Sequence, residues 1–266
     1  MQTSTVASNN HTGRFQWRAR LRAAAVHLAI SVAIAGVSAL LVFALWYPYP
    51  YGEVSEGRSL FMLVVAVDVV MGPVITLAIF NRAKPAAELK RDLAVVGLLQ
   101  LAALCYGLWT VHLARPVHMV FEYDRFRVVH QVEIPEEIAG KAPEGIEVAP
   151  WGGPTVIALR PFRSAQENSE MTMQALGGVP LSARTELWRP YATERKEVLL
   201  AAKPISALIK RFPQRAAEIE AASGKTGRPA TQVVFLPLVA RKEVAWTVLL
   251  DATTADILDY LPLDPY

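Results

Sequence analysis

Three long apolar segments dominate the first 114 residues, and no comparable run follows Arg115. The segments are residues 23–46, 59–80 and 93–114. A helix rises about 1.5 Å per residue, so each segment extends over about 30 Å, the thickness of the hydrocarbon core of a bilayer. The pattern predicts three transmembrane helices within residues 23–114, after an N-terminal tail at 1–22.

The remaining residues, 115–266, alternate between apolar and polar positions and are numerous enough for one domain with its own core. Ser164 predicts a helix N-cap, with the helix reaching Leu176 before Gly177-Gly178. Helices are also expected at 204–211 and 213–222, each beginning at a proline, with Gly224 as the C-terminal stop. Strands are expected at 119–123, 126–133, 155–159, 233–239, 244–250 and 255–261, with turns at Asp124-Arg125, Arg241-Lys242 and 251–253.

The order of strands, helices and strands predicts an α+β domain with an antiparallel sheet. The expected fold class is therefore a membrane protein, in which a three-helix transmembrane bundle precedes an α+β extracytoplasmic domain.

Charge sets the expected orientation. Before Arg115 there are nine Lys/Arg and five Asp/Glu, and from Arg115 onward eighteen and nineteen, so the basic excess belongs to the membrane region. Most of it lies in the N-terminal tail and in the loop between the second and third segments. The positive-inside rule places both in the cytoplasm, and three crossings then place residues 115–266 outside. No basic stripe interleaved with aromatic residues indicates binding of nucleic acid.

Smaller features refine this topology. The first apolar segment is too long for a cleaved signal peptide, and residues 1–13 are expected to be disordered. The aromatic run from Trp46 to Tyr51 is expected at the outer membrane interface. The lone cysteine, Cys105, lies in the third segment, so the outer domain has no disulfide, as is typical of a bacterial periplasmic domain.

Asp68 is the polar residue that most demands explanation, because it lies in the middle of the second apolar segment. A carboxylate at mid-bilayer costs about 2.5–3.5 kcal/mol on insertion scales. Residue counting places Ser38 and Tyr106 at a similar depth, whereas His27 is too far away and Gln100 lies about two turns deeper than Tyr106. A hydrogen bond from Ser38 or Tyr106 is therefore expected.

Gly72-Pro73 follows Asp68 and predicts a kink, with Thr76 or a neighbouring helix satisfying the freed carbonyl of Val69. Three interpretations of Asp68 stay open: internal polar packing, contact with a partner, and proton or ion chemistry. The first segment also carries two rows of small residues that favour close helix approach, either inside the bundle or toward a separate helix. The rows are Ala25, Ala29, Ala33 and Ser31, Ala35, Ala39.

Catalytic, metal and cofactor signatures are missing from the sequence. Ser223-Gly-Lys-Thr226 resembles the end of a phosphate loop, but Ile219 stands where the leading glycine is required. His118 and His130 lie on neighbouring predicted strands, where a metal pair is conceivable but solvated strand residues are the expected outcome. The sequence thus predicts a binding protein without cofactor, metal or enzymatic activity.

The chain resembles the TfpX/TfpZ family of type IV pilin accessory proteins over almost its whole length after about residue 14. The stretches that carry the resemblance are Leu45-Trp-Tyr-Pro48, Val67-Asp-Val-Val-Met-Gly-Pro73, Asp92-Leu-Ala-Val95, Gln100-Leu-Ala-Ala-Leu104, Tyr106-Gly107, Ala114-Arg-Pro-Val117, Phe121-Glu-Tyr-Asp-Arg-Phe126 and Leu263-Asp-Pro-Tyr266. The resemblance implies an inner-membrane protein that assists a cognate pilin, which is itself held in the membrane by one N-terminal helix.

The leading hypothesis is accordingly a non-enzymatic pilin accessory protein or chaperone with a periplasmic domain, whose partners are a type IV pilin and the lipid bilayer. Its candidate intramembrane site comprises Asp68, Gly72, Pro73, Ser38, Tyr106 and Gln100. Two alternatives remain: a membrane-anchored sensor subunit that binds a ligand, and a proton-coupled carrier centred on Asp68.

Overall fold

The computed structural model describes residues 8–81, 84–240 and 245–266, and its chain forms two compact units. The helical unit comprises the chain up to Ala44 together with Arg58–His112. The sheet unit comprises Leu45–Gly57 together with Leu113–Tyr266. The segment between the first and second apolar helices therefore belongs to the sheet unit.

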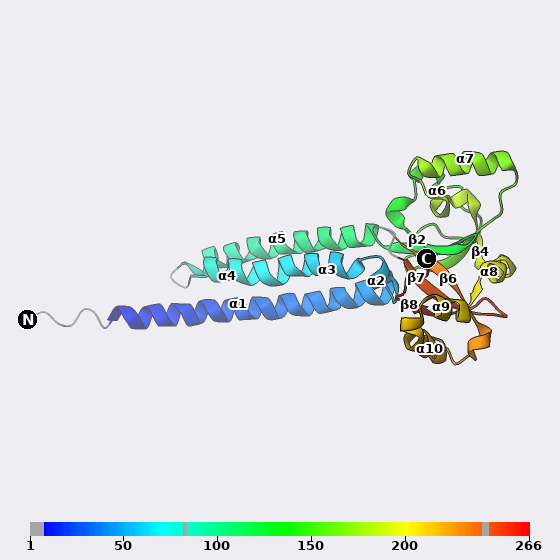
Figure 1. Ribbon diagram of the computed structural model, residues 1–266. Coiled ribbons are helices and arrows are strands. Elements are labelled where there is room, and N and C mark those ends of the chain that lie inside the picture. The colour runs from blue at the N-terminus through cyan, green and yellow to red at the C-terminus, as the bar shows by residue number, and fades with distance from the viewer. Residues whose placement is uncertain (1–7, 82–83, 241–244) are drawn as a thin grey trace, which may run out of the picture. The chain divides into compact units, whose positions relative to one another are not determined.

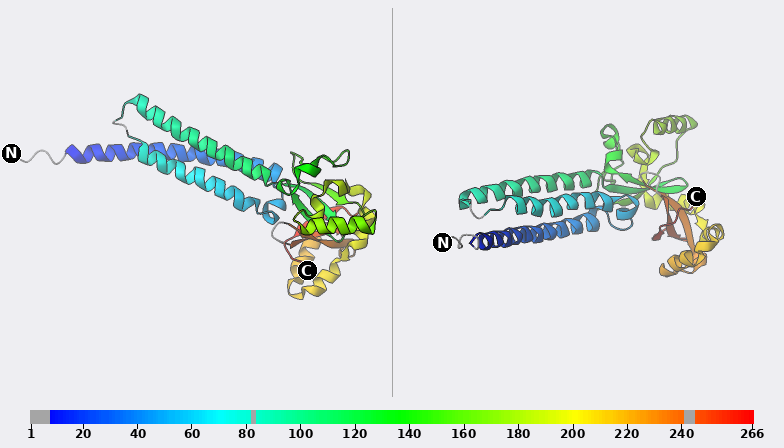
Figure 2. Two further views of the ribbon diagram at one scale, coloured as in Figure 1. Left: turned by 90° about the horizontal axis from the view of Figure 1, so that it is seen from above. Right: turned by 60° about the vertical axis from the view of Figure 1, so that its left-hand side comes forward.

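Long helices run lengthwise beside one another in the helical unit (Figures 1 and 2). Helix α1, Ser8–Leu41, continues into a π-helical turn at Val42–Trp46. Helix α3, Gly57–Ala66, is followed by a π-helical turn at Val67–Met71 and then by α4, Gly72–Ile79, while α5 covers Ala86–Leu113. In the described part of the chain, three helical stretches are long and apolar enough to cross a membrane: Trp17–Trp46, Gly57–Ile79 and Ala86–Leu113.

These stretches confirm the three predicted apolar helices, although the first and third begin earlier than expected. Because α1 begins at Ser8, the part of the predicted disordered tail at residues 8–13 is helical. The rest of that prediction, residues 1–7, lies outside the described residues.

A mixed sheet organises the sheet unit, with strand order β4-β3-β1-β2-β6-β7-β8 and with β5 paired to β6. The strands in the described ranges are β1 Pro116–Glu122, β2 Arg125–His130, β3 Thr155–Leu159, β4 Trp188–Pro190, β5 Lys203–Pro204, β6 Val233–Val239, β7 Ala245–Asp251 and β8 Ile257–Leu261. The β1–β2 hairpin and the β6–β7–β8 meander are antiparallel, as predicted. The predicted turn at Arg241-Lys242 lies outside the described residues.

The prediction of a purely antiparallel sheet is wrong, because β1 pairs with β3, and β2 with β6, in parallel. Parallel neighbours need a long crossover between them. Residues 123–154, which include β2, connect β1 to β3, and residues 131–232 connect β2 to β6. Hydrophobic alternation within each strand carries no information about these pairings.

Several short helices surround the sheet: α2 Tyr51–Val54, α6 Glu136–Ala139, α7 Ala165–Leu176, α8 Arg195–Ala201, α9 Ile205–Arg211 and α10 Ala216–Lys225. Helix α7 has the predicted bounds, and the Ser164 side chain accepts a hydrogen bond from the Glu167 N–H at 3.1 Å. The helix predicted at 213–222 is shifted: Pro213–Arg215 forms a 3-10 turn, and α10 runs through Gly224 to Lys225.

The segment Leu45–Gly57 contributes to the core of the sheet unit. Tyr51 and Val54 belong to the same buried cluster as residues of β1, β2, β6 and β7. Trp46 packs edge-to-face on Trp151, with ring centroids 5.5 Å apart. Trp46 and Tyr51 are only 4% and 5% exposed, so these two rings pack inside the sheet unit; the position of the aromatic run at a membrane interface stays a prediction.

Gly153 shows why the turn before β3 needs glycine. Its φ is +107°, and a Cβ at this position would collide with the Leu45 carbonyl oxygen. The glycine therefore lets the backbone of the turn lie directly against the start of Leu45–Gly57.

Candidate functional site

Asp68 lies in the π-helical turn Val67–Met71, immediately before α4. Pro73 has no N–H donor, so the α-helical hydrogen-bond ladder is interrupted close to it. A π-helical turn bonds residues five apart, and such turns are frequent at functional sites. At Gly72-Pro73, where a kink is predicted, the irregularity in the helix is this π-helical turn.

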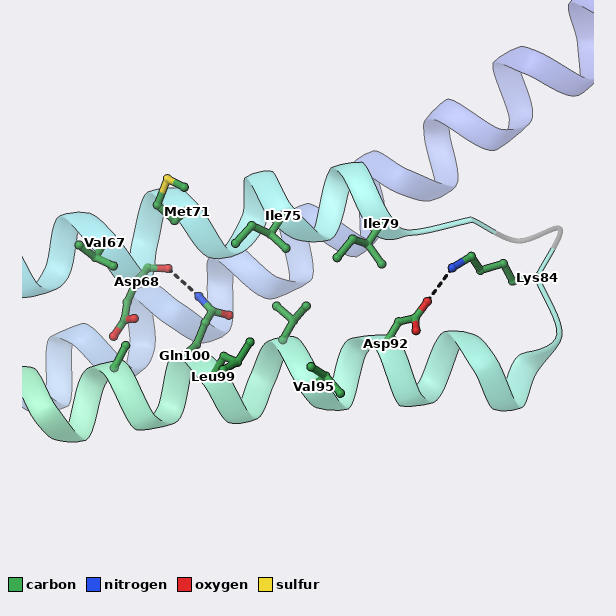
Figure 3. A pocket seen from close by; sticks show the side chains of 12 residues that line it. Val67, Asp68, Met71, Ile75, Ile79, Lys84, Asp92, Val95, Leu99 and Gln100 are labelled. Atoms are coloured by element: carbon green, nitrogen blue, oxygen red, sulfur yellow. Dashed lines mark hydrogen bonds and ion pairs between the residues drawn. The ribbon is translucent and has the colours of Figure 1, made fainter.

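Gln100 on α5 reaches this turn from the neighbouring helix (Figure 3). Its side-chain amide donates a hydrogen bond to the backbone carbonyl of Asp68 at 3.3 Å. A Cβ on Gly72 would collide with this amide, so glycine is required for the approach. Three of the predicted site residues, Asp68, Gly72 and Gln100, are thus brought together.

The Asp68 carboxylate itself makes no hydrogen bond or ion pair with the described residues. The Gln100 carboxamide oxygen is buried and also has no hydrogen-bond partner among them. Two side chains therefore present acceptor oxygens at the same place on facing helices. A buried acceptor without a partner is costly, so the site is suited to a donor from another molecule.

Two grooves meet at Asp68. The larger, of about 580 Å³, runs between α4 and α5 and is visible in Figure 3. The smaller, of about 150 Å³, opens between α1 and α5. Asp68 and Gln100 line both grooves, whose remaining walls are mostly aliphatic: Val67, Met71, Ile75, Ile79, Val95, Val96 and Leu99 in the larger, and Ile30, Ile34, Ala35, Val65, Leu101 and Leu104 in the smaller.

Ser38 and Tyr106 differ in their relation to Asp68. Ser38 is buried and lines the smaller groove with Asp68. Tyr106 is 74% exposed and makes no hydrogen bond to Asp68; its backbone carbonyl accepts one from Thr110 at 3.0 Å. The hydrogen bonds predicted from Ser38 and Tyr106 to Asp68 are not found among the described residues.

His27 has a partner that the sequence did not reveal. Its Nδ1 lies 2.6 Å from the hydroxyl of Thr76, which is buried between α1 and α4. The predicted separation of His27 from Asp68 agrees with this pairing. Thr76 thus links two helices through its side chain.

The two small-residue rows of α1 have different environments. Ser31 is buried, and Ala35 and Ala39 are half-buried. Ala25, Ala29 and Ala33 are all exposed. The Ser31 row therefore packs inside the helical unit, whereas the Ala25 row forms an exposed face of small side chains on α1.

His118 and His130 of the sheet unit are buried, so the expectation of solvated strand residues is wrong. The His118 ring bonds to the Thr155 hydroxyl and the Val148 carbonyl, and burial lowers its pKa to about 4. The Nδ1 of His130 lies 3.0 Å from the Glu133 carboxylate. In the described part of the chain, no group of three or more His, Cys, Asp or Glu side chains is arranged to hold a metal ion.

Curated relatives match almost the whole chain. The fimbrial assembly protein of serogroup I from Dichelobacter nodosus is 32% identical over 94% of this chain and 98% of its own length. The serogroup E1 protein of the same organism is 31% identical over the same shares. This chain belongs to the family of fimbrial assembly proteins.

The model of the fimbrial assembly protein FimB family matches residues 15–56. In this fimbrial assembly protein, that match covers most of α1 and nearly all of Leu45–Gly57, the part of the sheet unit that precedes α3. No solved structure matches the chain significantly.

Proposed function

We propose that this fimbrial assembly protein is a non-enzymatic accessory protein that binds a type IV pilin in the bacterial inner membrane and keeps it competent for assembly. The observation that carries the proposal is the pair of acceptor side chains, Asp68 and Gln100, that line both grooves between apolar helices. The resemblance to the TfpX/TfpZ pilin accessory proteins supports the choice of partner.

The chemistry of the grooves fits an apolar helix that carries a hydrogen-bond donor. Aliphatic walls would pack against such a helix, and the Asp68 carboxylate would accept from its donor. A single bond of this kind contributes about 0.6 kcal/mol on average in membranes, so the contact would be reversible. An accessory protein must release the pilin for assembly, so its contact with the pilin has to be reversible.

The proposed topology follows the distribution of basic residues. The N-terminus and the loop after α4 would face the cytoplasm, and the sheet unit would lie in the periplasm. A pilin held by one membrane helix would then present its head to the same compartment as the sheet unit.

Site-specific photo-crosslinking in cells that make the pilin tests the proposal. A crosslinker at Val67, which is exposed and lines the larger groove, should capture pilin. The matched control is Val37, which is exposed on α1 and lines none of the grooves described here. Equal capture at both positions, or no capture together with normal piliation after deletion of the gene, contradicts the proposal.

A further inference from the structure

A third groove, of about 720 Å³, lies toward the N-terminal end of α1 and does not include Asp68. Helix α1 forms one wall, and residues of α4 and α5 form the other. Its volume is within the range of about 300–1,000 Å³ that is common for sites holding one ligand. Its composition changes along its length, from cationic at one end to apolar at the other.

The cationic end is formed by Arg18 and Arg22, which lie one helical turn apart on α1. Neither guanidinium makes an ion pair with the described residues. The acids at the start of α5 are already engaged, since Glu88 and Asp92 lie 3.2 and 2.7 Å from Lys84 Nζ. Arg18 and Arg22, which have no acidic partner among the described residues, thus lie at one end of a mostly apolar groove.

The rest of the groove is long and mostly apolar, and it also includes His27 and Thr76, which are hydrogen-bonded to each other. Ala23, Val26 and Ile30 continue the α1 wall, and Phe80 and Leu93 oppose them. From Arg18 to Ile30 the groove extends about 18 Å at 1.5 Å per residue, slightly more than half the thickness of a hydrocarbon core of about 30 Å. Gly97 leaves its part of the wall open, because nothing lies within 4 Å of the position of its missing Cβ.

We propose that this groove binds one anionic phospholipid, with the phosphate between Arg18 and Arg22 and an acyl chain along Ala23, Val26 and Ile30. Guanidinium groups bind phosphate through charge-assisted, often bidentate hydrogen bonds. Basic pockets at the ends of transmembrane helices recognise anionic headgroups for this reason. The half-bilayer length of the groove matches a lipid of one leaflet. This site goes beyond pilin binding and requires only that the apolar helices lie in a bilayer.

Native mass spectrometry of the full-length protein from bilayers of phosphatidylglycerol and phosphatidylcholine tests the site. The wild type should retain phosphatidylglycerol preferentially. The double variant Arg18→Gln, Arg22→Gln should lose that preference by about tenfold or more, because each basic residue near a membrane surface contributes about 1 kcal/mol. Gly97→Leu should lower retention without changing charge, because its side chain would occupy the groove.

Matched controls separate this site from general attraction. The double variant Lys90→Gln, Arg91→Gln removes two exposed charges from α5 outside the groove, and Gly36→Leu adds a side chain at a glycine with open space around it. Both should retain phosphatidylglycerol as the wild type does. Equal loss in these controls, equal retention of the two lipids, displacement by glycerol phosphate, or occupation by a second copy of the chain would each overturn the proposal.

Discussion

The amide of Gln100 donates to the backbone carbonyl of Asp68 at 3.3 Å through the space that a side chain on Gly72 would fill. This bond satisfies the backbone carbonyl five residues before Pro73 and leaves the Asp68 carboxylate without a partner in the described residues. Within the helical unit, Gln100 therefore holds α5 to the π-helical turn, and the Asp68 carboxylate remains able to accept a hydrogen bond.

Gly72→Ala is predicted to displace Gln100 and to stabilise the helical unit less than a glycine-to-alanine change elsewhere in a helix. Alanine is favoured over glycine by about 1 kcal/mol in a helix interior, and loss of the Gln100 bond would offset about 0.6 kcal/mol or more of this gain. The control is Gly36→Ala, where nothing lies within 4 Å. Thermal unfolding in detergent measures both; equal stabilisation would show that Gln100 contributes nothing through this contact.

Asp68→Asn is predicted to support pilus assembly close to the wild-type level, whereas Asp68→Leu is predicted to abolish most of it. Asparagine keeps an acceptor oxygen and removes ionisation, while leucine removes the acceptor. The measurement is piliation, together with the amount of pilin crosslinked at Val67. Loss of function in Asp68→Asn as well would favour a role for the ionised group and thus the proton-coupled alternative.

Tyr51→Ala is predicted to destabilise the sheet unit by about 3–5 kcal/mol, because it empties a buried position in the main apolar cluster. Tyr49→Ala is the control: Tyr49 is 59% exposed, packs edge-on against Trp246 and Tyr260, and donates a long hydrogen bond of 3.4 Å to the Tyr260 carbonyl, so about 1 kcal/mol is expected. Chemical denaturation of the full chain compares the two. A loss of only about 1 kcal/mol for Tyr51→Ala as well would mean that Tyr51 does not anchor Leu45–Gly57 in the core.

Acidification is predicted to weaken the sheet unit through His118. Its pKa is about 4 in the folded chain and 6.5 in the unfolded chain, so only the unfolded chain takes up a proton between these values. Stability from this group is complete above pH 6.5 and falls by up to about 3 kcal/mol as the pH approaches 4. The change follows from burial of the ring, which disfavours the charged imidazolium.

His118→Gln, which cannot titrate, should remove this part of the pH dependence. The comparison uses the difference between wild type and variant, because burial raises the pKa of Glu122 and gives an opposite slope that is common to both. Urea unfolding at pH 7, 6, 5 and 4 provides the measurement. Parallel stability curves for the two proteins would exclude His118 as the cause.

Local chemistry accounts for the features that could be predicted from the sequence. Ser164 marks the start of α7, and turn residues separate the strands of the C-terminal meander. Asp68 is recognisable because a carboxylate in an apolar run is costly and is rarely kept without a polar contact. Gln100 is a predicted site residue, but residue counting places it about two turns deeper than Tyr106, and its bond to the Asp68 backbone carbonyl depends on how α5 lies against the π-helical turn.

Relationships between distant parts of the chain could not be predicted in this way. The pairing of β2 with β6 joins strands about a hundred residues apart, and no local pattern encodes its direction. The aromatic run around Tyr51 has the composition of a membrane-interface belt, and only tertiary packing decides that the Tyr51 ring lies in the core of the sheet unit. The contact between His27 and Thr76 likewise depends on how α1 lies against α4.

The discontinuous core of the sheet unit has a consequence for biosynthesis. Tyr51 and Val54 leave the ribosome before α3, α4 and α5 are made, whereas their partners on β1 and β2 follow those helices. At a translation rate of about 5–20 residues per second, β1 and β2 are synthesised several seconds after Tyr51 and Val54. During that interval the aromatic residues of Leu45–Gly57 lack their partners, so this core can close only after α3, α4 and α5 have been synthesised.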